Sequence, residues 1–334
     1  AIGKNTMGAN TTGGENTAIG REALDANTTG ANNVAVGNNA LSANTTAASN
    51  TGVGYRALYV NTTGGKNVAV GEKSLYSNTT GSQNVALGYE SLKAHTTSAD
   101  CVAVGYQSQL ATTTGTNNTS LGMGSLRTIT TQSGNTAIGT ASQYISAAAG
   151  NTSVGFESLR YNTTGDVNTA IGKDAMKANT TGRMNTSVGY ESLAINTTGS
   201  NNTAVGKAAM YSNTTGTDNV ALGYAALPNN TTASYNTAIG RQAMDANTTG
   251  HSNTGVGRRV MPANTTGSSN TAMGIDCMEA NTTGNNSVAM GSNTLKANTT
   301  GHYNTAIGYT ALSKNTTASN NTAIGRAVLF NNTT

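Results

Sequence analysis

Residues 16–37 read NTAIGREALDANTTGANNVAVG, and this stretch decides the fold because the rest of the chain repeats it. The glycine that closes each Ala-Ile-Gly motif recurs every 17 residues, apart from one interval of 16 residues between Gly139 and Gly155. A short fixed period is the signature of a stacked repeat architecture. We therefore predict an all-β, single-chain β-solenoid (β-roll or β-helix) with one 17-residue repeat per turn and about 20 turns, forming an elongated rod without caps.

The residues that lead up to each glycine predict a short strand. The residue before the glycine is Ile, Val, Leu or Met, and the residue two positions earlier is Thr or Val, as in Thr17 and Ile19. This period-two spacing predicts that both residues face the core. The residue between them is Ala, Ser or Gly, as in Ala18, Ala35 and Gly52. We expect this small column to mark either a seam with another chain or tight packing within one chain.

A second apolar anchor lies four residues after the glycine. Eighteen of the 20 repeats have Leu or Met there, and Gln109 and Gln143 are the exceptions. About six residues lie between the glycine and the Asn-Thr-Thr-Gly segment, which is too short for a stable helix. The pattern therefore favours a second short strand in each turn, with Gly and Asn at the corners.

Asparagine recurs at two corners of the repeat. One series starts at Asn10 and Asn27, and the other at Asn16 and Asn33. Stacked amides hydrogen-bond along the stacking axis in cross-β assemblies. We expect two such ladders to stabilise a thin core.

Residues 95–151 break the pattern. The first asparagine corner reads His95, Thr112, Ile129 and Ser146 here, both glutamine anchors occur here, and so does the one-residue deletion. A bend, a bulge or a specialised binding zone is one interpretation, and sequence drift is the other.

The uniform repeat indicates one continuous repeat domain over residues 1–334. The net charge is +4, and the basic residues are scattered, so we expect no nucleic-acid partner. No apolar run approaches the roughly 18 residues of a membrane span. Because the chain starts and stops in mid-repeat, we expect it to be a slice of a longer chain.

No catalytic, cofactor or metal site is expected. The three histidines are isolated and are interpreted as surface imidazoles, the two cysteines as small packing residues, and the acidic residues as solvated loop charges without a paired carboxylate. These residues are His95, His251, His302, Cys101, Cys277, Glu22, Asp25, Glu90, Asp174 and Glu191.

The position directly after the glycine carries aromatic residues interleaved with charged ones. Such a column could stack on sugar rings or bind cations, so it is a possible surface-binding site. Alternatively, the aromatic rings only cover a corner of the coil. The column consists of Tyr55, Tyr89, Tyr106, Phe156, Tyr190, Tyr224 and Tyr309.

The motif Asn-Thr-Ala-Ile-Gly-x-x-Ala-Leu-x-x-Asn-Thr-Thr-Gly resembles the repeats of bacterial and phage tail-fibre-type extracellular proteins. Its Ala-Ile-Gly-x-x-Ala part is similar to the head repeats of trimeric autotransporter adhesins, although the present repeat is longer. The resemblance implies a left-handed β-roll, a homo-oligomer with a trimer favoured, an extracellular location on a cell-surface appendage or a virion, and attachment to host or prey surfaces such as cell-surface glycans.

The leading hypothesis is a non-catalytic structural and adhesive shaft segment of an extracellular fibre. The alternative is an ice-binding β-solenoid with threonine ladders, although only one threonine of each adjacent pair, such as Thr28 and Thr29, should point outward. A carbohydrate-active enzyme would require clustered carboxylates on one face, and the sequence has no such cluster.

Overall fold

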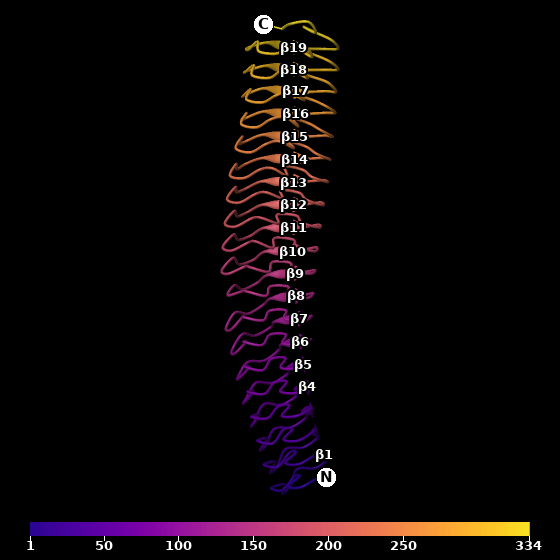
Figure 1. The fold of residues 1–334 in the computed structure, drawn as a ribbon, viewed down its shortest axis with the longest axis vertical. Helices are drawn as coiled ribbons and strands as arrows, with labels where there is room; N and C mark the ends of the chain where they lie inside the picture. Colours follow the sequence, from indigo (N-terminus) through magenta and orange to yellow (C-terminus); the bar gives the residue numbers. More distant parts are fainter. Residues whose placement is uncertain (334) are drawn as a thin grey trace. The chain divides into compact units, whose positions relative to one another are not determined.

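The computed structural model describes residues 1–333 and divides the chain into two compact units, Ala1–Asp166 and Val167–Thr334. Each unit is a β-solenoid in which every turn carries one short strand, and the strands of neighbouring turns lie side by side in chain order (Figure 1). The predicted fold class is thus confirmed. Thr334, the last residue of the predicted domain, lies outside the described residues, and a single continuous domain stays a prediction.

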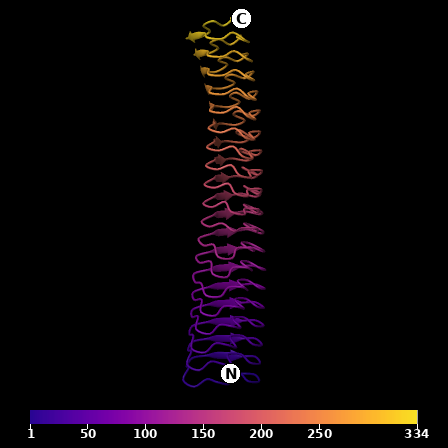
Figure 2. The ribbon, with the colours of Figure 1, turned by 90° about the vertical axis from the view of Figure 1, so that its left-hand side faces the viewer.

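The strands are all parallel, and their register equals one repeat. Thr17 pairs with Val34, for example, and Val220 pairs with Thr237. In both ribbon views the strands of a unit occupy the same wall of successive turns (Figure 2). Unit 1 contains β1 (Thr17–Ile19), β2 (Val34–Val36), β3 (Thr51–Val53), β4 (Val68–Val70), β5 (Val85–Leu87), β6 (Val102–Val104), β7 (Thr119–Leu121), β8 (Thr136–Ile138) and β9 (Thr152–Val154). Unit 2 contains β10 (Thr169–Ile171), β11 (Thr186–Val188), β12 (Thr203–Val205), β13 (Val220–Leu222), β14 (Thr237–Ile239), β15 (Thr254–Val256), β16 (Thr271–Met273), β17 (Val288–Met290), β18 (Thr305–Ile307) and β19 (Thr322–Ile324).

The prediction of two strands per turn is wrong. The rest of each turn is bent by residues with left-handed backbone, as at Glu15, Glu22 and Leu24, whose φ angles are 58°, 54° and 55°. Alternating left-handed residues cannot form an extended strand. The backbone still bonds to the next turn here, because Leu24 N–H donates to Ala40 O at 3.0 Å. Hydrogen bonds between turns therefore continue outside the strands and offset the strain of the left-handed leucine.

The predicted orientation of the strand is also wrong. Ala18 in the centre of β1 is buried, whereas Ile19 is 41% exposed, and this pattern of a buried centre and more exposed flanks holds in β1–β19. The small column therefore lies inside the coil and is not a seam with another chain. The aliphatic residue before each glycine points outward.

The width of the interior explains this orientation. Between the first and last repeats the Leu or Met anchor is buried as predicted and fills the space opposite the strand, so only a small side chain fits between them. A Cβ on Gly52 would lie 3.3 Å from Leu41 Cγ, and one on Gly255 would lie 3.1 Å from Met244 Cγ. A large aliphatic residue in the centre of the strand would overpack the core.

Both predicted asparagine ladders are present. In the first, Asn44 Nδ2 donates to Asn27 Oδ1 at 2.9 Å and to Ala47 O at 3.1 Å. In the second, Asn67 N–H donates to Asn50 Oδ1 at 2.9 Å. These amides are fully buried. The ladders thus satisfy the buried polar groups of a thin core, as expected.

The irregular stretch 95–151 interrupts the core of unit 1. One buried apolar cluster extends to Ala103, and a separate one contains Leu126, Ile129 and Ala137. Gln109 and Gln143 occupy the leucine position and are fully buried. Gln109 Nε2 donates to Val102 O and Ser120 Oγ, both at 2.9 Å, whereas neither polar atom of Gln143 has a hydrogen-bond partner. The stretch therefore lowers the stability of this part of the coil.

His95 contradicts the expectation of a surface imidazole, because it is fully buried in the first asparagine ladder. Its Nε2 lies 3.0 Å from Ser98 O, and Asn78 Oδ1 in the turn below has no hydrogen-bond partner. Burial lowers the pKa of His95, and the contact with Ser98 O only partly opposes this effect. The folded protein therefore holds this imidazole neutral.

We expect a His95→Asn variant to be about 1–2 kcal/mol more stable at pH 7.5, because the new amide can donate to Asn78 Oδ1. The wild type should also lose stability as the pH falls below about 6.5, where the unfolded chain takes up a proton that the folded chain resists. The variant should lack this loss. Urea unfolding at pH 7.5 and pH 5.0 measures both effects. The exposed His251→Asn serves as the control, and an identical pH dependence of all three proteins would contradict the prediction.

Candidate functional site

The outward side chains of the strands form an uncharged surface of threonine and aliphatic side chains on each unit, which we term the strand face. It consists of the first and third residues of β1–β9 in unit 1 and of β10–β19 in unit 2. In these strands the outward positions hold only Thr, Val, Ile, Leu or Met, and none is charged. Side chains such as Val70 and Leu222 are 38% and 44% exposed. The strand face is therefore a continuous uncharged strip on each unit.

The extent of the strand face exceeds that of scattered surface apolar residues. Three-residue strands are about 10 Å long and about 4.8 Å apart, which gives on the order of 430 Å² in unit 1 and 480 Å² in unit 2. The largest surface patch on a typical soluble monomer is of this size and is often functional. The strip is bordered by polar and aromatic positions, for example Lys66 before β4 and Tyr89 after β5. An apolar centre with such a rim is typical of a protein–protein interface.

The predicted aromatic column lies next to the strand face, because its residues follow the glycine that closes each strand. All seven predicted residues are exposed. Tyr89 and Tyr106, from neighbouring turns, stack with ring centroids 5.3 Å apart. Lys207 Nζ lies 5.6 Å from the ring centroid of Tyr190 and 5.9 Å from that of Tyr224. The rings are therefore accessible, and whether they bind a ligand stays a prediction.

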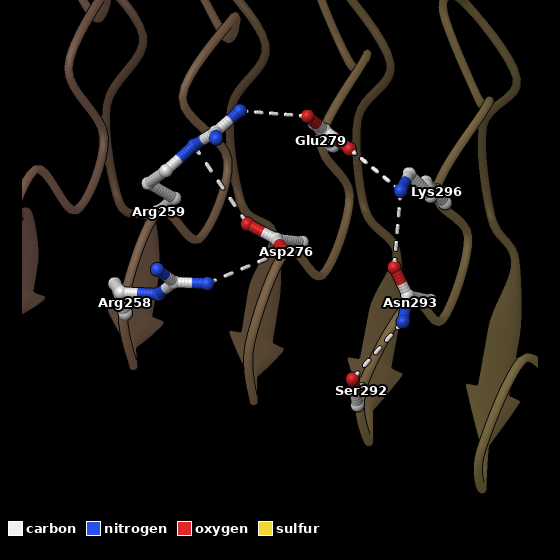
Figure 3. A network of polar contacts seen from close by, with 7 residues as sticks. All are labelled: Arg258, Arg259, Asp276, Glu279, Ser292, Asn293 and Lys296. Atoms are coloured by element: carbon white, nitrogen blue, oxygen red, sulfur yellow. Dashed lines mark hydrogen bonds and ion pairs between the residues drawn. The ribbon is translucent and has the colours of Figure 1, made fainter.

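Charged residues cross-link the turns beside this column. In unit 2, Arg259 Nη2 lies 2.8 Å from Glu279 Oε1, and Lys296 Nζ lies 3.1 Å from Glu279 Oε2 (Figure 3). Asp276 contacts both Arg258 and Arg259. Exposed pairs of this kind contribute little to stability. They neutralise one another, which agrees with the interpretation of the acidic residues as loop charges, although Glu90 is buried against Lys93 and Gln107.

Two predicted aromatic residues, Tyr106 and Phe156, line one hollow in unit 1. The hollow also contains Arg127, Tyr144 and Arg160, which we did not single out from the sequence. The available signal was the pair of small residues Gly124 and Ala141, at a repeat position where the flanking turns carry Gln107 and Glu157. The hollow is thus the point where that stretch and the aromatic column meet.

The remaining candidate residues carry little chemistry. Cys101 and Cys277 are buried free thiols, and burial raises the pKa of Cys277 to about 12, which keeps it protonated and unreactive. His251 is exposed, as predicted. Thr28 Oγ1 donates to Thr45 O at 3.1 Å, whereas Thr29 is exposed, so one threonine of this pair points outward as expected.

Within residues 1–333, no group of three or more His, Cys, Asp or Glu side chains could hold a metal ion. The same part of the chain has no helix that is long and apolar enough to cross a membrane. Comparisons with protein-family models, with curated proteins and with solved structures give no match for this chain.

Proposed function

We propose that the chain is a non-catalytic shaft segment of an extracellular fibre, in which copies of the chain pack through their strand faces and present the remaining surface for adhesion. The observation that carries the proposal is the uncharged strip of outward Thr, Val, Ile, Leu and Met side chains along each unit. Burial of such a strip against a second copy would remove apolar surface from water at roughly 25 cal/mol per Å². Three chains around one axis are favoured by the resemblance to adhesin heads.

The area of the strand face fits this role. Each unit alone offers a strand face on the order of 430 to 480 Å², the size of the largest surface patch on a typical monomer, which is often functional. No outward strand residue within β1–β19 is charged, so a copy could pack there without burying an unpaired charge. Location on a cell surface or virion remains part of the proposal.

The ice-binding alternative has weaker support. Its threonine column is one residue wide, because the other threonine of each pair uses its hydroxyl to bond the next turn, as Thr45 Oγ1 does with Thr62 O at 3.2 Å. The strand face itself mixes Thr with larger aliphatic residues. A thermal hysteresis measurement on the full chain distinguishes the two functions.

The strand face can be tested with a triple variant, Val53→Lys, Val70→Lys and Leu87→Lys. The three charges lie on successive turns at outward positions, so the coil can still fold. We expect the variant to sediment as a monomer under conditions in which the wild type is oligomeric, because burying these ammonium groups is costly.

A matched control places the same three charges on another wall of the same turns, with Thr46→Lys, Thr63→Lys and Thr80→Lys. These side chains are exposed. The control should keep the oligomeric state of the wild type in analytical ultracentrifugation. Equal dissociation of both variants, or of neither, would argue against assembly through the strand face.

A further inference from the structure

A hollow of about 400 Å³ lies in unit 1, among the turns that follow β6, β7, β8 and β9. This volume is within the range of small-ligand sites. Tyr106, Met123 and Phe156 at its edge are exposed, so a ligand can enter from solvent. Its lining comes from four successive turns and includes Gln107, Gly124, Arg127, Thr140, Ala141 and Tyr144.

The hollow exists because two neighbouring turns lack a long side chain at one position of the repeat. The second residue after the closing glycine is Gln107, Gly124, Ala141 and Glu157 in four successive turns. Gly124 and Ala141 thus leave a gap between two long side chains. The ring of Tyr144 packs into the gap from one side, since a Cβ on Gly124 would lie 3.1 Å from Tyr144 Cε2.

Small residues alone do not create such a space. Ala208 and Ala225 occupy the same repeat position in two successive turns of unit 2. There, however, Lys207 extends over the rings of both Tyr190 and Tyr224. At the corresponding position between Met123 and Phe156 the chain has the short Thr140, which cannot cover the gap.

The hollow contains a cation whose charge is not compensated. Arg127 donates from Nε and Nη2 to Gln107 Oε1, at 3.2 and 3.0 Å, and from Nη1 to the Tyr144 hydroxyl. Both partners are neutral, and Arg127 has no carboxylate partner among residues 1–333. Arg160, by contrast, is paired with Glu157. The site thus has a net positive charge and is suited to one anionic group, which a guanidinium binds well.

The aromatic residues indicate what carries the anionic group. The rings of Tyr106 and Phe156 are 51% and 47% exposed and lie three turns apart, about 14 Å along the stack. Exposed rings at both ends of this largely apolar hollow suit a chain of sugar rings, whose apolar faces can pack on them while Thr140 bonds a hydroxyl group. We propose that this hollow binds an acidic saccharide, with its carboxylate on Arg127. The inference rests on the proposed adhesive role and names its ligand class.

Calorimetric titration of the full chain tests the ligand class with three probes. Trigalacturonic acid and sialyllactose carry a carboxylate on different sugars, and maltotriose is neutral. We expect at least one acidic probe to bind at least about tenfold more tightly than maltotriose, because the carboxylate gains a charge-assisted bond. The probe that binds shows which of the two acidic sugars carries the carboxylate that the site recognises. Binding of neither acid, or equal binding of maltotriose, would overturn the proposal.

Two variants connect binding to the hollow. Ala141→Gln restores a long side chain found in other turns, such as Gln107, so it should fold normally, fill the gap and abolish binding. Arg127→Gln should weaken binding of the acidic probe about tenfold or more and leave binding of maltotriose unchanged. Arg56→Gln is the matched control, since Arg56 also lies over aromatic rings in unit 1 but outside the hollow, and it should bind like the wild type.

Unchanged binding by Ala141→Gln, with an unchanged melting temperature, would show that the ligand lies elsewhere and would refute the inference. The fibre proposal is tested separately, because the hollow does not include the strand face. Sedimentation of the same variants should show the oligomeric state of the wild type. A monomeric wild type that binds the acidic probe would contradict the fibre proposal and would leave the saccharide inference supported.

Discussion

A Gly71→Ala variant is expected to lose about 4 kcal/mol of unfolding free energy or more. The φ angle of Gly71 is +130°, in a region that only glycine adopts without strain. An added Cβ would also lie 2.6 Å from Gly88 O in the next turn. Neither Gly71 nor Gly88 can move aside, because the backbone of each belongs to a stacked turn. Urea unfolding monitored by circular dichroism measures the loss.

Gly14→Ala is the matched control. A Cβ at Gly14 would meet no atom within 4 Å, and its backbone is not left-handed. This control should change stability by less than about 0.5 kcal/mol. A Gly71→Ala variant that unfolds with the same midpoint as Gly14→Ala would contradict the close approach of successive turns at the closing glycines.

An Asn50→Ala variant is expected to lose about 3 kcal/mol. Asn50 Oδ1 accepts from Asn67 N–H at 2.9 Å and from Asn67 Nδ2 at 3.1 Å, and Asn50 Nδ2 donates to Gly64 O at 2.9 Å. Removal of the amide would leave the buried backbone N–H of Asn67 without its partner. Gly64 O would keep the bond from Asn61, so the unpaired N–H dominates the cost.

The comparison variant is Asn38→Ala, in a neighbouring turn. Asn38 is exposed, and its side chain forms no hydrogen bond within the described part of the chain. Chemical denaturation of both variants should place Asn38→Ala within about 0.5 kcal/mol of the wild type. Similar values for the two variants would mean that the amide ladder contributes little to stability.

The sequence predicts the solenoid and its ladders because each depends on recurrence. Glycine, asparagine and the Leu or Met anchor return at one interval, and a stack is the fold in which equal residues meet. The orientation of the strand could not be obtained from alternation, since a period of two fits either face. The orientation is decided by the limited space across the coil, where Leu41 lies opposite Gly52.

Other features had no sequence signal of their own. Leucine rarely adopts left-handed backbone, so nothing local marks Leu24 as a bend; the hydrogen bonds between turns impose it. The aromatic column was visible as a pattern, and its exposure follows from its place after the strand. Arg127 and Tyr144 were not singled out because the hollow depends on which long side chains are missing around them.

The central claim is that copies of this chain assemble through the strand face. The most direct measurement is the molar mass of the full chain in solution by multi-angle light scattering at micromolar concentration. One chain has a mass of 33.6 kDa, so the favoured trimer should give three times this value, about 101 kDa. A mass of 33.6 kDa across the concentration range would contradict the account.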